Sequence, residues 1–302
     1  AVFRASPSEL EAAGLSGSVA RSVAGGCTFE EAAEQIEKAK AAGAEVVVWA
    51  ESRYPQRLRD IFDPPLVLFV RGRIELFNTL MVAMVGTRRA TPYGMAVATR
   101  LAADLGRAGL TVVSGMARGI DTAAHKGALE AHAPTVAVLG CGVDVVYPSE
   151  NRKLASMIAE QGLLVSEFPM GAPAYPQNFP IRNRIISGMS AGVVVVEGAE
   201  YSGSSITARL AMDQGREVFA VPGNITSKMS WGPNLLIKQG AKLVQEAGDI
   251  LNELPPEERL RLMGPKDGQE ADSSTTGPKE PVFGEAAILE RKVLENLSAD
   301  AA

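Results

Sequence analysis

The sequence predicts an α/β fold: an extended Rossmann-like, doubly wound and mostly parallel sheet with a small N-terminal helical region. Short apolar, β-branched runs alternate with helix-like stretches from residue 81 to about residue 253. The runs are apolar throughout, which indicates strands covered by helices on both faces. The run at residues 81–85 leads into Gly86 and a helix start at Thr91-Pro92, as in the first turn of a nucleotide-binding α/β unit.

The expected elements follow in order along the chain. Residues 6–43 favour short helices, and the stretch at 30–42 ends at Gly43, a suitable helix C-cap. Two apolar runs separated by proline turns predict strands at residues 45–49 and 66–70. The regular part predicts strands at residues 81–85, 110–114, 135–139, 163–166, 193–196, 218–221 and 241–244.

Domain boundaries follow from composition. We expect a helical region at residues 1–44 and the Rossmann-like domain at residues 45–254. Residues 255–284 are rich in Pro, Gly, Ser, Thr and charge, which predicts a flexible linker. Residues 285–302 contain a short helical stretch that is too small to form a domain alone.

Composition narrows the class of protein. Hydrophobic residues make up 46% of the 302 residues and charged residues 22%, as in an ordinary globular protein. No run of 18 apolar residues occurs, so no membrane-spanning segment is expected. Cys27 and Cys141 lack metal-ligand spacing, which favours the reducing cytoplasm. Because the net charge is −5, any contact with nucleic acid requires a local basic patch.

The strongest candidate site is the loop that follows the strand at residues 81–85. It reads Gly86-Thr87-Arg88-Arg89 and precedes a helix N-terminus, where backbone N–H groups and the helix dipole favour phosphate. Guanidinium groups bind phosphates bidentately and stack on bases, so the loop predicts a polyanion site. Alternatively, Gly86 only turns the chain and the arginines are solvated.

Other strand ends add candidates at the same edge of the sheet. Ligands of open α/β sheets bind outside the carboxyl ends of the strands. Small, hydroxyl-bearing or basic residues follow these strands in several places, and the candidates are Ser114, Gly115, Arg118, Ser202, Gly203 and Ser204. Such a set of turns suits a phosphate chain better than a single mononucleotide.

A second basic segment runs from residue 178 to residue 184. Pro180 suits the first turn of a helix, which places Arg182, Asn183 and Arg184 near its N-terminal end. Cations there oppose the helix dipole, and an anionic ligand would offset that cost. Salt bridges of the arginines to Glu197 or Glu167 are the alternative. Phe179 is either a hydrophobic staple or a platform on which a base stacks.

Several catalytic motifs are absent from the sequence. There is no P-loop and no Gly-x-Gly-x-x-Gly fingerprint, so neither ATP hydrolysis nor a dinucleotide cofactor is expected. No carboxylates or histidines cluster at metal-ligand spacing, so we expect no metal. Asp121 and His125 are four residues apart and able to pair, but no nucleophile motif accompanies them, which favours a structural role.

These motifs together resemble the DNA-processing protein A family (DprA, also called Smf). The resemblance covers roughly residues 45–250. It is carried by Val85-Gly86-Thr87-Arg88, the segment 114–121 with Ala124-His125, Tyr147-Pro148 with Asn151, Ser166-Glu167, the segment 179–186, Ser202-Gly203-Ser204 with Thr207, and Val221-Pro222-Gly223.

The resemblance implies a non-catalytic, cytoplasmic protein that binds single-stranded DNA in natural transformation. Such proteins protect incoming strands and help to load the RecA recombinase. They are typically homodimers, often with an N-terminal helical domain of the SAM or helix-hairpin-helix kind and a C-terminal winged-helix module. Residues 1–44 are similar to the former, and residues 285–302 match the start of the latter.

Site roles also follow from the resemblance. Gly86, Thr87 and Arg88 would hold backbone phosphates, and Phe179 would stack on a base. Arg182 and Arg184 would line the same pocket, with donors from Ser202, Gly203 and Ser204. Leu235, Leu236 and Ile237 match a region used for self-association, although a core helix is the competing interpretation. Some members have a basic residue shortly before Phe179, where this chain has Tyr175-Pro176-Gln177.

An enzyme of a related Rossmann branch, a nucleoside-monophosphate phosphoribohydrolase, is the alternative. These enzymes carry Pro-Gly-Gly-x-Gly-Thr-x-x-Glu at the helix start after a late strand, and the Glu acts in the chemistry. This chain has Ser202-Gly203-Ser204-Ser205-Ile206-Thr207 there and no following glutamate. Its catalytic carboxylate would have to be Glu197.

Overall fold

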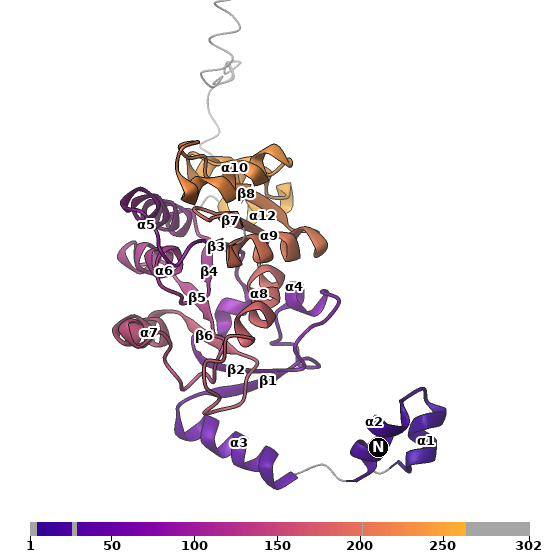
Figure 1. Cartoon of the computed structure of the whole chain (residues 1–302). Helices are drawn as coiled ribbons and strands as arrows, with labels where there is room; N and C mark the ends of the chain where they lie inside the picture. Colours follow the sequence, from indigo (N-terminus) through magenta and orange to yellow (C-terminus); the bar gives the residue numbers. More distant parts are fainter. Residues whose placement is uncertain (1–4, 26–28, 201, 264–302) are drawn as a thin grey trace, which may run out of the picture. The chain divides into compact units, whose positions relative to one another are not determined.

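A single mixed sheet organises the protein. The computed structural model describes residues 5–25, 29–200 and 202–263 (Figure 1). Within them, nine strands form a sheet in the order β1-β2-β6-β5-β4-β3-β7-β8-β9. The strands are β1 (Glu45–Val48), β2 (Val67–Gly72), β3 (Met81–Val85), β4 (Thr111–Ser114), β5 (Thr135–Val138), β6 (Leu163–Ser166), β7 (Gly192–Val195), β8 (Glu217–Ala220) and β9 (Lys242–Leu243). Each lies at or within two residues of its expected position.

The strands from β6 to β9 in this order pair in parallel, whereas β1 pairs antiparallel with β2, and β2 pairs antiparallel with β6. The mostly parallel, Rossmann-like fold is therefore confirmed. The helices are α1 (Pro7–Ala12), α2 (Gly17–Ala24), α3 (Phe29–Ala41), α4 (Gln56–Arg59), α5 (Pro92–Arg107), α6 (Ile120–Glu130), α7 (Arg152–Gln161), α8 (Asn178–Met189), α9 (Gly203–Asp213), α10 (Trp231–Lys238), α11 (Ala247–Glu253) and α12 (Pro256–Met263). Short 3-10 helices lie at η2 (Ile74–Asn78), η3 (Ser149–Asn151) and η4 (Lys228–Ser230).

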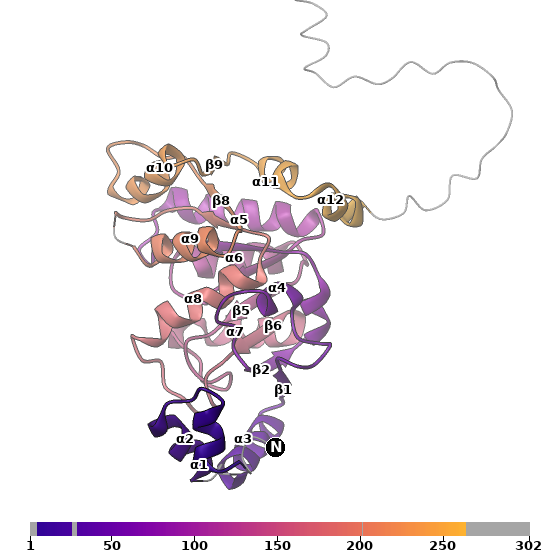
Figure 2. The ribbon, with the colours of Figure 1, turned by 90° about the vertical axis from the view of Figure 1, so that its right-hand side faces the viewer.

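Helices cover both faces of the sheet. Figures 1 and 2 show α5, α6 and α7 on one side, and α4, α8 and α9 on the other. All five residues of β3 are buried. Its alternate side chains serve two cores: Met81 and Ala83 pack with residues of α8 and α9, whereas Met84 packs with residues of α5 and α6. A strand between two helical layers must be apolar on both faces, which explains its unbroken hydrophobic run.

The strand order creates a crevice beside β3. From β3 the chain builds β4, β5 and β6 outward on one side, and then crosses back to place β7 against the other edge of β3. The loops after β3 and β7 therefore leave the sheet in opposite directions. Such a switch point opens a ligand site at the carboxyl ends of the strands.

Glu197 fixes the beginning of α5. Thr91 is the N-cap of this helix and accepts a hydrogen bond from the Gly94 N–H, with Pro92 following it. The Glu197 carboxylate accepts hydrogen bonds from the Thr91 backbone N–H at 2.9 Å and from the Thr91 hydroxyl at 2.6 Å. A carboxylate at a helix N-terminus is stabilised by the helix dipole, so Glu197 joins the end of β7 to the start of α5.

The linker expected from residue 255 was wrong at its beginning. Pro256–Met263 form α12, in which Glu258 pairs with Arg57 and Leu262 packs against the core beneath α5. The composition of this segment predicted a linker because it is rich in proline and charge. The contacts that hold α12 in place are made with residues distant in sequence, which composition does not reveal. The rest of that linker and residues 285–302 lie outside the described residues. Across residues 5–25, 29–200 and 202–263, no helix has the length and apolarity needed to cross a bilayer.

Candidate nucleic-acid interface

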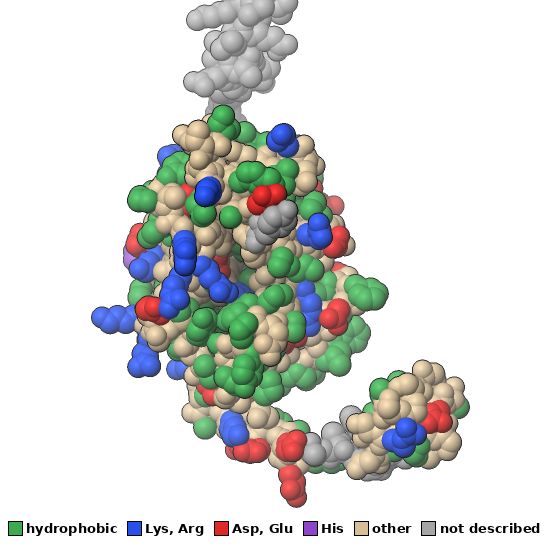
Figure 3. All heavy atoms as spheres, in the orientation of Figure 1, with side chains coloured by type: hydrophobic (Ala, Val, Ile, Leu, Met, Phe, Trp, Pro, Cys, Tyr) green, Lys and Arg blue, Asp and Glu red, His purple; other side chains and the backbone are tan. Residues whose placement is uncertain are grey.

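A pocket of about 570 Å³ opens at the carboxyl ends of β3 and β7. The loop after β3, the first turns of α8 and the start of α9 line it. Figure 3 shows Lys and Arg side chains gathered at one rim of a hollow, with hydrophobic side chains below it. The predicted site residues that the structure brings together here are Gly86, Thr87, Arg88, Arg89, Phe179, Arg182, Asn183, Ser202, Gly203 and Ser204.

Hydrogen bonds fix the backbone of the loop after β3, and two of its side chains, Arg88 and Arg89, are exposed cations. The Thr87 N–H donates to the Glu197 carbonyl oxygen at 2.8 Å, and the Thr87 hydroxyl accepts from the Arg89 N–H at 3.1 Å. Arg88 and Arg89 are exposed. Neither forms a salt bridge within the part of the chain that the structure describes. Both guanidinium groups are therefore available to an anion.

Gly119 lets this loop pack against α6. It has a φ of 75°, and a Cβ atom there would lie 2.3 Å from the Thr87 carbonyl oxygen. Any other residue would be strained in this conformation and would push the loop away. Gly119 thus keeps the loop after β3 next to the first turn of α6.

Arg182 is a buried cation at the floor of the pocket. It is 3% exposed, donates from Nη1 to the Val138 carbonyl oxygen at 2.9 Å, and its Nε finds no partner among the described residues. Burial lowers its pKa to about 10, so it is charged at neutral pH. A positive charge held in a medium of low dielectric attracts an anion more strongly than a solvated one does.

Gly115 makes room for Arg182. A Cβ atom on Gly115 would lie 1.8 Å from Arg182 Nη1, so the guanidinium lies directly on this glycine. Gly115 thus acts by positioning Arg182, and it also lines a smaller hollow next to the main pocket.

The carboxylate of Asp121, which lines the pocket, accepts hydrogen bonds from the backbone. Its Oδ2 accepts them from the N–H groups of Gly115 at 3.1 Å and Ala117 at 3.4 Å. Burial raises the pKa of Asp121, and the charge of Arg182 opposes that rise. Asp121 does not pair with His125, whose Nδ1 contacts the Thr135 hydroxyl at 2.7 Å. The full burial of His125 agrees with the structural role expected for it.

Ser114 and Arg184 do not reach the pocket. Ser114 is fully buried and donates its hydroxyl hydrogen to the Met84 carbonyl oxygen at 2.6 Å, so its predicted place in the site was wrong. Arg184 binds the Glu167 carboxylate with two hydrogen bonds of 2.7 Å and contacts Asp63 at 3.2 Å. The ion-pair alternative is correct for Arg184, because its helix turns it away from Arg182.

Arg118 lies at the edge of the site. It is exposed, pairs with Glu150 and lines the smaller hollow instead of the main pocket. The staple interpretation of Phe179 was wrong, because Phe179 lies within α8 and lines the pocket.

Tyr147 also lines the pocket and was not among the predicted site residues. Its ring centroid lies 5.5 Å from that of Phe179, with an angle of 37° between the planes. The Tyr147-Pro148 dipeptide was visible in the sequence, but nothing in its local pattern places the ring beside α8.

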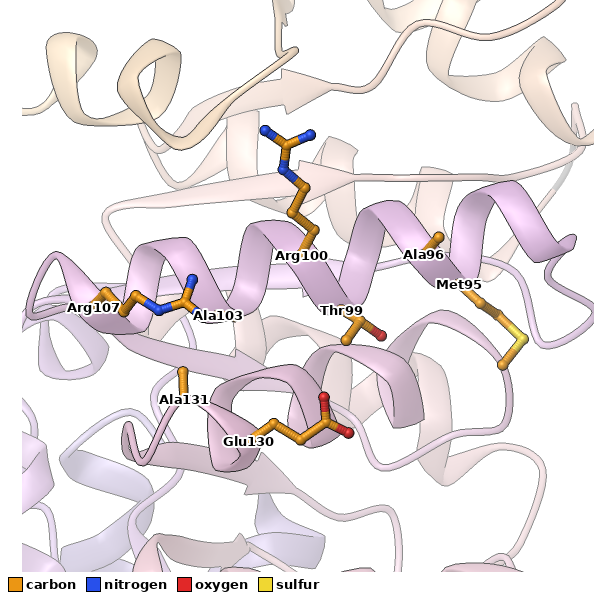
Figure 4. A pocket seen from close by; sticks show the side chains of 8 residues that line it. All are labelled: Met95, Ala96, Thr99, Arg100, Ala103, Arg107, Glu130 and Ala131. Atoms are coloured by element: carbon orange, nitrogen blue, oxygen red, sulfur yellow. The ribbon is translucent and has the colours of Figure 1, made fainter.

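A second pocket lies on the surface of α5 and α6, with a volume of about 440 Å³. Figure 4 shows Arg100 and Arg107 extending from α5, with Glu130 on α6. Both arginines are exposed and both pair with Asp104. None of the buried polar atoms without a partner in the described residues lines this pocket, so it shows no preparation for a ligand.

The predicted self-association segment divides between core and surface. Leu236 is buried and packs into the core that includes residues of α9, so it is wrong as an interface residue. Leu235 and Ile237 are half-buried on α10. Three adjacent helical residues point in different directions, which is why they cannot share one surface.

The comparisons with known proteins agree with this geometry. The family model described as DNA recombination-mediator protein A matches residues 45–255. The chain is 44% identical to the DNA processing protein DprA of Bacillus subtilis over 214 residues, which cover 70% of this chain and 72% of the relative. It is 48% identical to protein Smf of Escherichia coli over 202 residues, which cover 67% of this chain and 54% of the relative. The chain thus spans about half the length of the latter.

Two solved structures are also similar. DprA of Streptococcus pneumoniae superimposes with a TM-score of 0.76 at 36% identity, over 82% of this chain and 86% of that chain. DprA of Helicobacter pylori, a protein that binds single-stranded DNA, superimposes with a TM-score of 0.63 at 32% identity, over 69% of this chain and 94% of that chain. Because the matched segment is the whole sheet domain with the Arg88–Phe179 pocket, the chain belongs to the DNA recombination-mediator protein A family, the DprA/Smf family that its motifs resemble.

Proposed function

We propose that this protein binds single-stranded DNA in the pocket at the carboxyl ends of β3 and β7. The strand's phosphates contact Arg88, Arg89 and Arg182, and a base enters beside Phe179. The helix start at Ser202, Gly203 and Ser204 supplies further hydrogen-bond donors.

One observation carries the proposal: arginines that form no salt bridge within the described residues lie against a partly exposed aromatic ring, in a chain of net charge −5. The Arg88 guanidinium carbon lies 5.0 Å from the Phe179 ring centroid, and that of Arg182 lies 5.9 Å away. This arrangement binds phosphates and stacks a base without reading base edges, which suits a single strand. The bases of a duplex are stacked and paired, so duplex DNA fits it poorly. The binding of single-stranded DNA by the similar Helicobacter pylori protein supports the same conclusion.

Fluorescence anisotropy of a labelled oligothymidine tests the proposal. We expect binding that weakens steeply with salt, needs neither nucleotide nor metal, and resists competition by a duplex of equal length. Equal competition by the duplex, or no binding to the oligonucleotide, would contradict it.

Delivery of the strand to the RecA recombinase is the finer part of the proposal. It is supported by the family membership and by the position of the open pocket at one edge of the sheet. The test is RecA filament assembly on an oligonucleotide, which we expect this protein to accelerate. The Arg88→Ala variant should lose that acceleration while RecA alone behaves as before.

Self-association at the β9 edge is a further part of the proposal. β9 ends the sheet with two residues, and Leu243 on it is 45% exposed, with half-buried Ile237 on α10. An exposed strand edge with apolar side chains favours pairing with a second copy. Leu243→Glu should shift the mass in light scattering from dimer to monomer. Leu66→Glu, a change at a site 70% exposed near the opposite edge, should leave the dimer intact.

Glu197 argues against the phosphoribohydrolase alternative. Both of its carboxylate oxygens are engaged by Thr91, and it is 2% exposed and does not line the pocket. We therefore expect no release of free base from AMP or CMP. Base release that Glu197→Gln abolishes would restore the enzyme interpretation.

A further inference from the structure

Two hollows share one wall of side chains. The main pocket adjoins a smaller hollow of about 20 Å³, whose own lining includes Arg118 and Pro148. The residues that line both are Arg88, Ala117, Tyr147 and Phe179. We call these shared residues the ridge. A strand that leaves the main pocket on this side therefore passes over the ridge before it reaches Arg118.

The Tyr147 ring is the open surface of this ridge. It is 41% exposed, although it packs against Phe179 at a centroid distance of 5.5 Å. A base cannot enter between the two rings, because contact on both of its faces would require about 7 Å. The face of Tyr147 that points away from Phe179 is the surface left for stacking.

Arg118 is an exchangeable cation beyond the ridge. Its side chain is 57% exposed and pairs with Glu150, which is 59% exposed. An ion pair between two solvated side chains contributes little stability, so a phosphate readily replaces Glu150. A phosphate also offers Arg118 a bidentate acceptor of comparable geometry.

We propose that Tyr147 and Arg118 form a second nucleotide subsite: the base next to the one beside Phe179 stacks on Tyr147, and the following phosphate binds Arg118. This subsite extends the site assigned under the proposed function and rests on it. Its contribution depends on oligonucleotide length, because a strand that fills only the main pocket reaches neither Arg118 nor the face of Tyr147 that points away from Phe179.

A length series of oligothymidines measures the subsite. Because Tyr147 also lines the main pocket, the test is a difference between lengths: we expect Tyr147→Ala to weaken the binding of longer oligonucleotides about tenfold more than that of the shortest binding oligonucleotide. Tyr147→Phe keeps the ring and should behave like the wild type. Arg118→Ala should reduce the salt slope by about 0.7, and only for the longer oligonucleotides. Glu150→Gln releases Arg118 and should strengthen binding of those same oligonucleotides.

An abasic residue provides a direct check on the stacking. The abasic residue is placed at each position of the oligonucleotide in turn. At the position next to the base in the main pocket it should lower the affinity of the wild type, and this loss of affinity should be absent in Tyr147→Ala. The subsite is refuted if Tyr147→Ala binds every length as the wild type does, or weakens all lengths equally. Wild-type protein that binds no oligonucleotide at all overturns the proposed function and the subsite together, whereas a bound but length-insensitive wild type overturns the subsite alone.

Discussion

The guanidinium group of Arg88 lies over the ring of Phe179, 5.0 Å from its centroid. The two residues come from the loop after β3 and from the first turn of α8, which are far apart in sequence. A cation over an aromatic face is attracted by the ring's quadrupole, so Phe179 orients Arg88 toward the pocket. Under the proposed function, this contact places a guanidinium group that binds phosphate next to a ring on which a base stacks.

Arg88→Ala should weaken binding of oligothymidine and lower the slope of log affinity against log salt by about 0.7, the value for one phosphate contact on a single strand. Anisotropy titrations at several salt concentrations measure both quantities. Arg100→Ala, which removes an equal charge from the exposed surface of α5, is the matched control and should leave the slope as it is. An unchanged slope in Arg88→Ala would remove Arg88 from the site.

Gly115→Ala should displace Arg182, because the new Cβ atom would clash with Arg182 Nη1. We expect oligothymidine binding to weaken about tenfold, the loss typical of one charged hydrogen-bonded contact. The change should have no further effect in an Arg182→Ala background, since its target is then gone. Additive losses in the double variant would show that Gly115 acts independently of Arg182.

Arg184→Ala should destabilise the fold without affecting the site. Arg184 and Glu167 have side chains only 15% exposed, so removing one partner strands a largely buried charge, at a cost of about 3 kcal/mol. Urea denaturation should show a smaller loss for Arg184→Ala with Glu167→Ala than the sum of the two single losses. Folded Arg184→Ala should retain wild-type affinity for oligothymidine, and a reduced salt slope would return Arg184 to the interface.

His125 should make stability sensitive to acid. Burial lowers its pKa to about 3 from an ordinary value of 6.5, so between these values the unfolded chain binds a proton that the native state does not. Stability should therefore fall by about 1 kcal/mol per pH unit as pH drops below 6.5. Burial raises the pKa of Asp121, which works in the opposite direction.

His125→Gln should flatten this dependence in urea denaturation curves from pH 7 to pH 4. His132→Asn is the control, because His132 is exposed and Asn tolerates its φ of 55°. Parallel pH profiles for wild type and His125→Gln would show that His125 is not the titrating group.

The sequence by itself determined the strands, their mostly parallel arrangement and the edge of the sheet at which the pocket lies. Runs such as residues 81–85 are apolar on both faces, and only a strand between two helical layers is stabilised by such a pattern. Chain order then placed the loop of Arg88 at the carboxyl ends, where α/β proteins bind ligands. The segment around Phe179 was also predicted as part of the site, because arginines near a helix N-terminus oppose the helix dipole and an anionic ligand would offset that cost.

Tertiary structure alone decided which charged side chains line the pocket. Arg182 and Arg184 are two residues apart on α8, so they lie on nearly opposite sides of the helix and cannot both reach one pocket. Packing of α8 turns Arg182 onto Gly115 and Arg184 toward Glu167. Tyr147 and Glu197 acquired their places in the same way, through neighbours distant in sequence. Local pattern encodes periodicity and propensity, whereas the partner of a side chain depends on how whole elements pack.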